Sequence, residues 1–231
     1  MVFEIVEEVD GFWISYDPEA FEGWKPSTGD LKWIVEGIKR VMRDLNIQAP
    51  YFALELVPFG GLSSVSNPTC CVDKRKEVIY LRLPIDVVDG HLAISSEIRD
   101  DYIFYHELMH AKDCLEGRFP SGGFINPDEN PELALITSLW HFSIEGRLEK
   151  NNKPHKGRQQ TIEDEYFWAS RLEKSEMVEV EPGHWQRQIQ PWPLKKFITR
   201  EFLRKLCNKL WGKEVTFQEL QSLLESKVKS L

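Results

Sequence analysis

The feature of this sequence that most constrains its fold is a pair of histidines four residues apart, in the run His-Glu-Leu-Met-His at positions 106–110. Four residues make about one turn of an α-helix, so a helix would place both imidazole rings on one face, one above the other. We predict such a helix from about 99 to 116, because Gly117 suits the position just after the last helical turn. The motif therefore requires a helix here, packed so that one of its faces is left for the two rings.

Two imidazoles one helical turn apart can bind a single metal ion, with about 2.0–2.1 Å for each bond between zinc and nitrogen. Glu107 lies about 100° around the helix axis from His106, so its carboxylate can reach a metal-bound water without binding the ion itself. Zinc lowers the pKa of that water to about 7, which lets a carboxylate take its proton at neutral pH. The H-E-x-x-H pattern thus predicts one zinc ion, with His106 and His110 as ligands and Glu107 as the general base.

The alternative interpretation is that the pattern is accidental and that the helix is an ordinary structural one. Four apolar residues at helical spacing predict the buried stripe of this helix: Phe104, Leu108, Ala111 and Leu115. By helix geometry, His106 and His110 lie about 160–200° away from that stripe. They are therefore predicted to point away from the main packing face, where a cleft would be.

A catalytic zinc site needs a third protein ligand and leaves the fourth position for water. A later helix, predicted from 131 to 150, carries His141, Glu145 and Glu149 at four-residue spacing and hence on one face. We predict Glu145 as the third ligand and keep His141 as the alternative. Asp113 is a poorer ligand, because it lies on the motif helix itself. Asp113 and Glu149 are instead predicted to accept the second N–H group of a ligating imidazole.

The run at 106–110, followed by Ile-Glu-Gly-Arg-Leu-Glu at 144–149, resembles the zincin metallopeptidases. More narrowly it resembles the gluzincin branch, of which thermolysin is the type. In that branch the third ligand is the first Glu of an E-x-x-x-D motif on a later helix. The resemblance implies the zinc ligands His106, His110 and Glu145 and the general base Glu107. At the second acidic position of that motif this chain has Glu149 where the family has Asp.

The resemblance also implies how a substrate would bind. The segment 77–83 is similar to the edge strand of zincins, to which an extended peptide adds as one more strand. The metzincin branch fits poorly, because the positions of its Gly and its third His hold Asp113 and Glu116 here. The matching part of the chain covers about residues 77–150.

The pattern of the whole chain predicts an α+β fold with a zincin-like arrangement: a small, mostly antiparallel sheet, a backing helix, the motif helix and a helical C-terminal part. The predicted strands are 2–9 and 12–17, joined by a tight turn at Asp10-Gly11, then 51–57 and 77–83, the last stopped by Pro84. The predicted helices are 30–46, 99–116, 131–150, 161–175, 194–211 and 217–229, with a turn at Gly60-Gly61 and irregular structure over 177–193. We predict a single domain over 1–231, with one lobe from 1 to 117 and a mainly helical lobe from 118 to 231.

Composition narrows the classes of function that fit. Of the 231 residues, 42% are hydrophobic and 29% are charged, which is typical of a globular protein. The net charge of −8 argues against a nucleic-acid partner, since such proteins usually carry a basic face. The sequence has neither a secretion signal at its start nor the roughly 18 consecutive apolar residues of a spanning helix. We expect a cytoplasmic protein with reduced thiols, no membrane partner, and a peptide or protein as its substrate.

The predicted function is zinc-dependent hydrolysis of a peptide or amide bond. The main alternative is a zincin-like regulatory or binding protein that holds the metal with little general proteolytic activity. An oxyanion stabiliser is expected downstream, where the candidates are His155, Tyr166 and His184. Zinc affinity is predicted to fall below about pH 6, because ligating imidazoles must be neutral.

Overall fold

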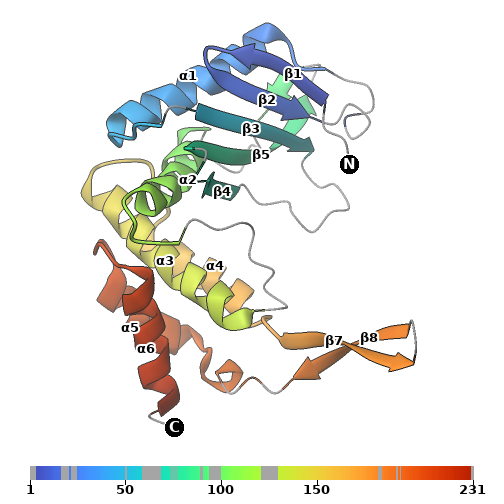
Figure 1. Ribbon diagram of the computed structural model, residues 1–231. Helices are drawn as coiled ribbons and strands as arrows, with labels where there is room; N and C mark the ends of the chain where they lie inside the picture. The colour runs from blue at the N-terminus through green and yellow to red at the C-terminus, as the bar shows by residue number, and fades with distance from the viewer. Residues whose placement is uncertain are drawn as a thin grey trace. The chain divides into compact units, whose positions relative to one another are not determined.

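The computed structural model describes residues 4–16, 21, 25–49, 51–58, 69–73, 75, 77–88, 91–93, 100–120, 130–181, 184–190, 192 and 194–229 (Figure 1). The chain divides into two compact units, Met1–Gly123 and Phe124–Leu231. The turn predicted at Gly60-Gly61 lies outside the described residues. Within the described part of the chain, no helix is both long enough and apolar enough to cross a membrane.

The first unit is built on a mixed β-sheet. Its strands are β1 (Glu4–Val9), β2 (Phe12–Tyr16), β3 (Tyr51–Pro58), β4 (Thr69–Asp73), β5 (Val78–Val88) and β6 (His91–Ala93), in the order β1-β2-β3-β5-β4, with β6 also pairing with β5. The two central pairings, β2 with β3 and β3 with β5, are parallel, whereas β1, β4 and β6 pair antiparallel with their neighbours. The α+β class is confirmed. The prediction of a mostly antiparallel sheet missed this parallel centre, which arises because a helix connects β2 to β3.

That connecting helix is α1 (Thr28–Asp44), and local sequence sets both its start and the hairpin before it. Asp10 and Gly11 have positive φ angles of 51° and 84°, as the tight turn predicted between β1 and β2 requires. Ser27 and Asp30 form a reciprocal capping box at the first turn of α1. At the middle of α1, a Cβ atom on Gly37 would lie 2.8 Å from the Phe104 ring, so the missing side chain lets the motif helix pack closely against α1.

Strand β5 runs further than predicted and does not lie at the edge of the sheet. It continues past Pro84 to Val88, with β3 on one side and β4 on the other. Proline is tolerated because the pairing with β4 ends at Arg82 and the pairing with β6 begins at Asp86. Between these two residues, the side of β5 that faces β4 and β6 has no strand pairing. The N–H group that proline lacks is therefore not needed there. The outer strand on this side is β4, which the sequence analysis did not predict.

The second unit is mainly helical. Its elements are α3 (Pro131–Lys150), α4 (Arg158–Ala169), β7 (Lys174–Glu181), β8 (His184–Gln190), a short 3-10 helix (Lys195–Phe197), α5 (Arg200–Leu210) and α6 (Phe217–Lys229). The predicted capping box of Thr216 and Glu219 is present at the start of α6. Gly212, predicted to end the helix before it, has a φ angle of 70°.

Two predictions for this unit were wrong. Helix α4 begins at Arg158 and ends at Ala169, whereas the predicted helix was 161–175. Thr161 therefore lies within the helix, where its hydroxyl donates to the Gly157 carbonyl instead of capping the first turn. The segment 177–193, predicted to be irregular, contributes most of an antiparallel hairpin of β7 and β8. Trp185 and Ile189 of this hairpin are exposed, so its strands lack the regular alternation of buried and polar residues on which strand prediction depends.

Helix α3 is fixed firmly within the second unit. A Cβ atom on Gly146 would lie 2.0 Å from the backbone nitrogen of Gly212, so α3 packs directly on the turn after α5. About one turn before Gly146 on α3, the Ser143 hydroxyl donates to the Lys213 carbonyl at 2.5 Å. These contacts set the rotation of α3 about its axis and hence the directions of His141 and Glu145.

Candidate metal centre

The motif lies on α2 (Asp100–Leu115), close to the predicted limits of that helix. Phe104, Leu108 and Ala111 of the predicted stripe are buried, and Leu115 is partly exposed. Burial extends further around the helix than predicted, because α1 packs on α2 and β4 packs on another part of its surface. His106 is partly exposed, whereas His110 is only 7% exposed.

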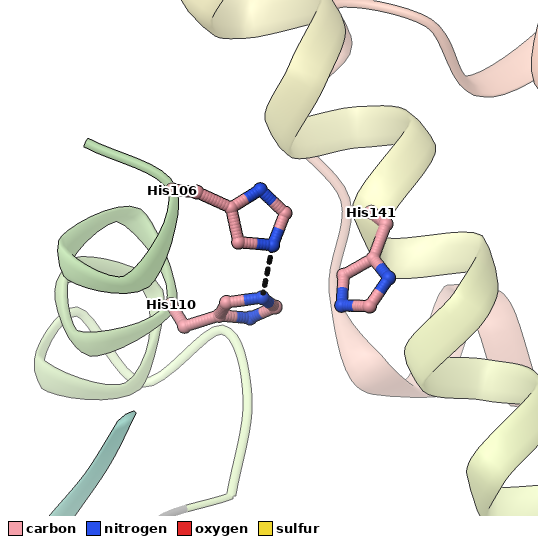
Figure 2. A group of neighbouring side chains, drawn as sticks. All are labelled: His106, His110 and His141. Atoms are coloured by element: carbon pink, nitrogen blue, oxygen red, sulfur yellow. Dashed lines mark hydrogen bonds between the residues drawn. The ribbon is translucent and has the colours of Figure 1, made fainter. Parts of the chain in front are cut away.

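The two motif histidines converge as the helical spacing predicts. Figure 2 shows both rings on the same side of α2, with their facing nitrogens joined by a dashed line. The two Nε2 atoms lie 3.3 Å apart, and the rings meet edge to face at an interplanar angle of 69°. In a tetrahedral zinc site with bonds of about 2.0–2.1 Å, two ligating nitrogens lie about 3.3–3.4 Å apart. The separation of the two Nε2 atoms therefore suits one tetrahedral ion without any movement of the helix.

Tyr102, one turn before His106, contacts the other nitrogen of that ring. Its hydroxyl oxygen lies 3.2 Å from His106 Nδ1. If Nδ1 carries the proton and donates to the hydroxyl oxygen, Nε2 keeps the lone pair that a metal needs. In that tautomer His106 presents the lone pair of Nε2 toward His110.

Glu107 is the buried acid of the motif, with 6% of its surface exposed. Burial raises the pKa of the Cys70 thiol on β4 well above its usual range, and the charge of Glu107 raises that pKa further. Cys70 is therefore a neutral thiol at physiological pH, and the carboxylate of Glu107 lies near β4.

Glu145, the predicted third ligand, lies on α3 in the second unit and is fully buried. Its Oε2 atom accepts the backbone N–H of Lys156 at 2.5 Å. This hydrogen bond joins α3 to the segment that leads into α4. The carboxylate therefore has a structural task within its own unit, and its role as a metal ligand stays a prediction.

His141, the alternative third ligand, lies one turn before Glu145 and has a different environment. It is the third side chain drawn in Figure 2, and 26% of it is exposed. Its Nδ1 atom lies 2.6 Å from Oε1 of Glu165 on α4, a carboxylate that is almost buried. A carboxylate on one ring nitrogen is the common arrangement behind histidines that bind a metal through the other nitrogen. Sequence analysis did not single out Glu165, since 24 residues separate it from His141.

Other predicted roles are neither tested nor excluded by these contacts. Asp113 is buried and pairs with Arg118 at 3.6 Å, and Glu149 accepts the indole N–H of Trp211 at 2.5 Å. The candidate oxyanion stabilisers all lie in the second unit: His155 donates from Nδ1 to the Lys153 carbonyl at 2.9 Å, Tyr166 lies beneath the Arg200 guanidinium, and His184 begins β8.

No protein-family model, no curated protein and no solved structure matches this chain. The chemistry of the site is therefore argued from its own residues.

Proposed function

We propose that this chain is a zinc-dependent hydrolase of peptide or amide bonds, with His106 and His110 as two ligands of one ion. The observation that carries the proposal is the 3.3 Å separation of their Nε2 atoms, which suits two ligands of one tetrahedral zinc ion. In a protein without metal, one ring would donate through its Nε2–H to the Nε2 lone pair of the other, so a measurement of bound zinc distinguishes the two arrangements.

The third ligand in this proposal is His141 rather than Glu145. Three histidines with one open position are a known catalytic zinc set, and the sequence offers His141 on α3 as the third. Glu145 has no exposed surface and accepts a backbone hydrogen bond, whereas His141 is partly exposed and has a carboxylate behind its Nδ1 atom.

Glu107 supplies the proton transfers. A bound zinc ion would polarise the scissile carbonyl group and acidify the water that occupies the open position. Glu107 would take a proton from the attacking water and later deliver it to the leaving amine. Its burial beside β4 shields the carboxylate from bulk water, so its charge acts more strongly on the attacking group than an exposed charge would.

The substrate that suits the sheet is an extended peptide. Among the strands that the structure describes, β4 pairs with β5 alone, and β4 also packs against α2. Its second edge therefore carries backbone groups next to the helix that bears Glu107. A peptide that adds to this edge as a strand would have its backbone fixed by main-chain hydrogen bonds. In the proposal, β4 takes the substrate-binding role that the sequence analysis gave to 77–83.

The test separates metal binding from catalysis. The protein is purified without chelators, its zinc content is measured by plasma mass spectrometry, and hydrolysis is followed with a library of quenched fluorescent peptides. We expect about one equivalent of zinc, and activity that falls by about 100- to 10,000-fold in Glu107→Gln while the zinc remains. Glu116→Gln, at the exposed end of the same helix, is the matched control and should keep both properties.

Two outcomes would overturn the proposal in different ways. Native protein that takes up no zinc on titration would leave the histidine pair as a structural contact. Zinc at one equivalent, with no hydrolysis of any peptide by the native protein, would favour the binding or regulatory alternative.

A further inference from the structure

Two of the proposed ligands, His106 and His141, share one arrangement at Nδ1, although they lie in different units. In each, Nδ1 contacts a side-chain oxygen: the Tyr102 hydroxyl at 3.2 Å for His106 and the Glu165 carboxylate at 2.6 Å for His141. An imidazole whose Nδ1–H donates to such an oxygen keeps its lone pair on Nε2. A carboxylate oxygen accepts only, so Glu165 holds His141 in this tautomer, whereas the Tyr102 hydroxyl can either donate to Nδ1 of His106 or accept from it.

We propose that Glu165 is a positioning residue, which fixes the tautomer and the orientation of His141 so that this ring binds the metal through Nε2. The proposal rests on the function proposed above and adds to it a residue that acts through His141. The short distance of 2.6 Å between Nδ1 of His141 and the carboxylate is typical of a charge-assisted hydrogen bond, which is stronger than one to a neutral acceptor. A carboxylate in this position also raises the basicity of the ligating nitrogen.

The neighbouring acids of α4 show why Glu165 differs from an ordinary charged residue. Glu163 pairs with Arg200 at 2.7 Å and Asp164 pairs with Lys156 at 2.6 Å, and both of these acids are partly exposed. Glu165 is 7% exposed, and the partner described for it is an imidazole instead of a permanent cation. Burial of a carboxylate is costly unless strong hydrogen bonds compensate it, so a carboxylate kept beside a ring that is neutral when it binds metal is expected to have a use there.

A purely structural link between α3 and α4 is the competing explanation. Removal of such a link would lower the stability of the protein without changing the metal affinity of the molecules that remain folded. The two explanations therefore differ in what they predict for zinc affinity and for variants that lack His141.

The experiment measures zinc affinity by competition with a chromophoric chelator and stability by urea unfolding of the metal-free protein. We expect Glu165→Ala to weaken zinc binding by about 10- to 100-fold. Glu165→Gln keeps an acceptor oxygen without the charge and should recover part of the loss. Glu163→Ala, on the same helix, is the matched control and should leave the affinity within about twofold.

A double-mutant cycle shows whether Glu165 acts through His141. In a His141→Ala background, Glu165→Ala should cause no further loss of zinc affinity, because the ring that it orients is gone. Equal losses in the two backgrounds, or an unchanged affinity with lowered stability, would overturn the positioning role while leaving the zinc site in place.

A second readout does not require metal. Long-range ¹H–¹⁵N spectra of the metal-free protein identify which ring nitrogen of His141 carries the proton. We expect protonated Nδ1 in the native protein and a mixture of tautomers in Glu165→Ala. If the native protein binds no zinc, the proposed function fails. In that case the metal-binding part of the role of Glu165 fails too. A mixture of tautomers in the native protein would also overturn its orientation of the ring, whereas protonated Nδ1 would support that orientation alone.

Discussion

The histidines of the two units differ in the origin of the group that orients them. His106 is held by Tyr102, four residues earlier on the same helix, through a neutral hydroxyl group. His141 is held by Glu165, 24 residues later on another helix, through a carboxylate. The first contact forms wherever α2 forms, whereas the second requires α3 and α4 to pack correctly. The pair on α2 is therefore preorganised by secondary structure alone, and the ligand from α3 depends on tertiary structure.

The largest effect should follow from removal of a histidine of the α2 pair. Either His106→Ala or His110→Ala leaves only one ligand on α2. Fewer bonds to the metal must then offset the entropy that is lost when the remaining ligands become ordered around it. We expect zinc affinity to fall by about 150- to 900-fold, from the roughly 3–4 kcal/mol that each ligand contributes to a structural zinc site. Chelator competition measures the loss, and an affinity within tenfold of the native value would show that the pair is not a ligand pair.

The pH dependence of zinc affinity gives the number of histidine ligands. A histidine in water has a pKa of about 6.5, and protons compete with the metal for each ligating nitrogen. Affinity is thus retained above that range and lost below it, by roughly tenfold per histidine ligand at pH 5.5. Three histidines predict a fall of about 1000-fold between pH 7 and 5.5, and two histidines with Glu145 predict about 100-fold. A flat affinity over this range would contradict histidine ligation altogether.

The choice between His141 and Glu145 has a direct test in two variants. His141→Ala should lower zinc affinity by about 100-fold and make its pH dependence less steep, since the preorganised pair on α2 remains. Glu145→Gln should instead destabilise the protein by about 1–3 kcal/mol, because it weakens the buried hydrogen bond from the Lys156 backbone. Urea unfolding of the metal-free variants measures the second effect. The reverse pattern would identify Glu145 as the ligand, in agreement with the prediction from sequence.

Sequence analysis predicted the parts of the molecule that local rules determine. The turn at Asp10-Gly11 and the capping box at Thr216 follow from side chains within three residues of one another. The motif helix and the convergence of its two histidines follow from helical spacing in the same way.

Features that depend on distant partners were missed or left open. Pro84 continues within β5 only because the pairings with β4 and β6 leave a gap opposite it, and no local pattern reveals such a gap. The same is true of Glu165, whose importance appears only when α4 packs beside α3. The third ligand stayed open for the same reason, since the periodicity of α3 places His141 and Glu145 on one face without showing which is buried.

The smallest effect tests the partner of His106. Tyr102→Phe removes one neutral hydrogen bond, worth about 0.5–1.5 kcal/mol, so zinc affinity should fall by about 2- to 13-fold. Tyr105→Phe is the matched control, because its hydroxyl group donates to Asp44 on α1 and should affect stability alone. Since a neutral hydroxyl group holds its ring less strongly than a carboxylate does, Tyr102→Phe should weaken binding less than Glu165→Ala. An equal or larger loss for Tyr102→Phe would show that a partner on the same helix orients a ligand as firmly as a buried charge does.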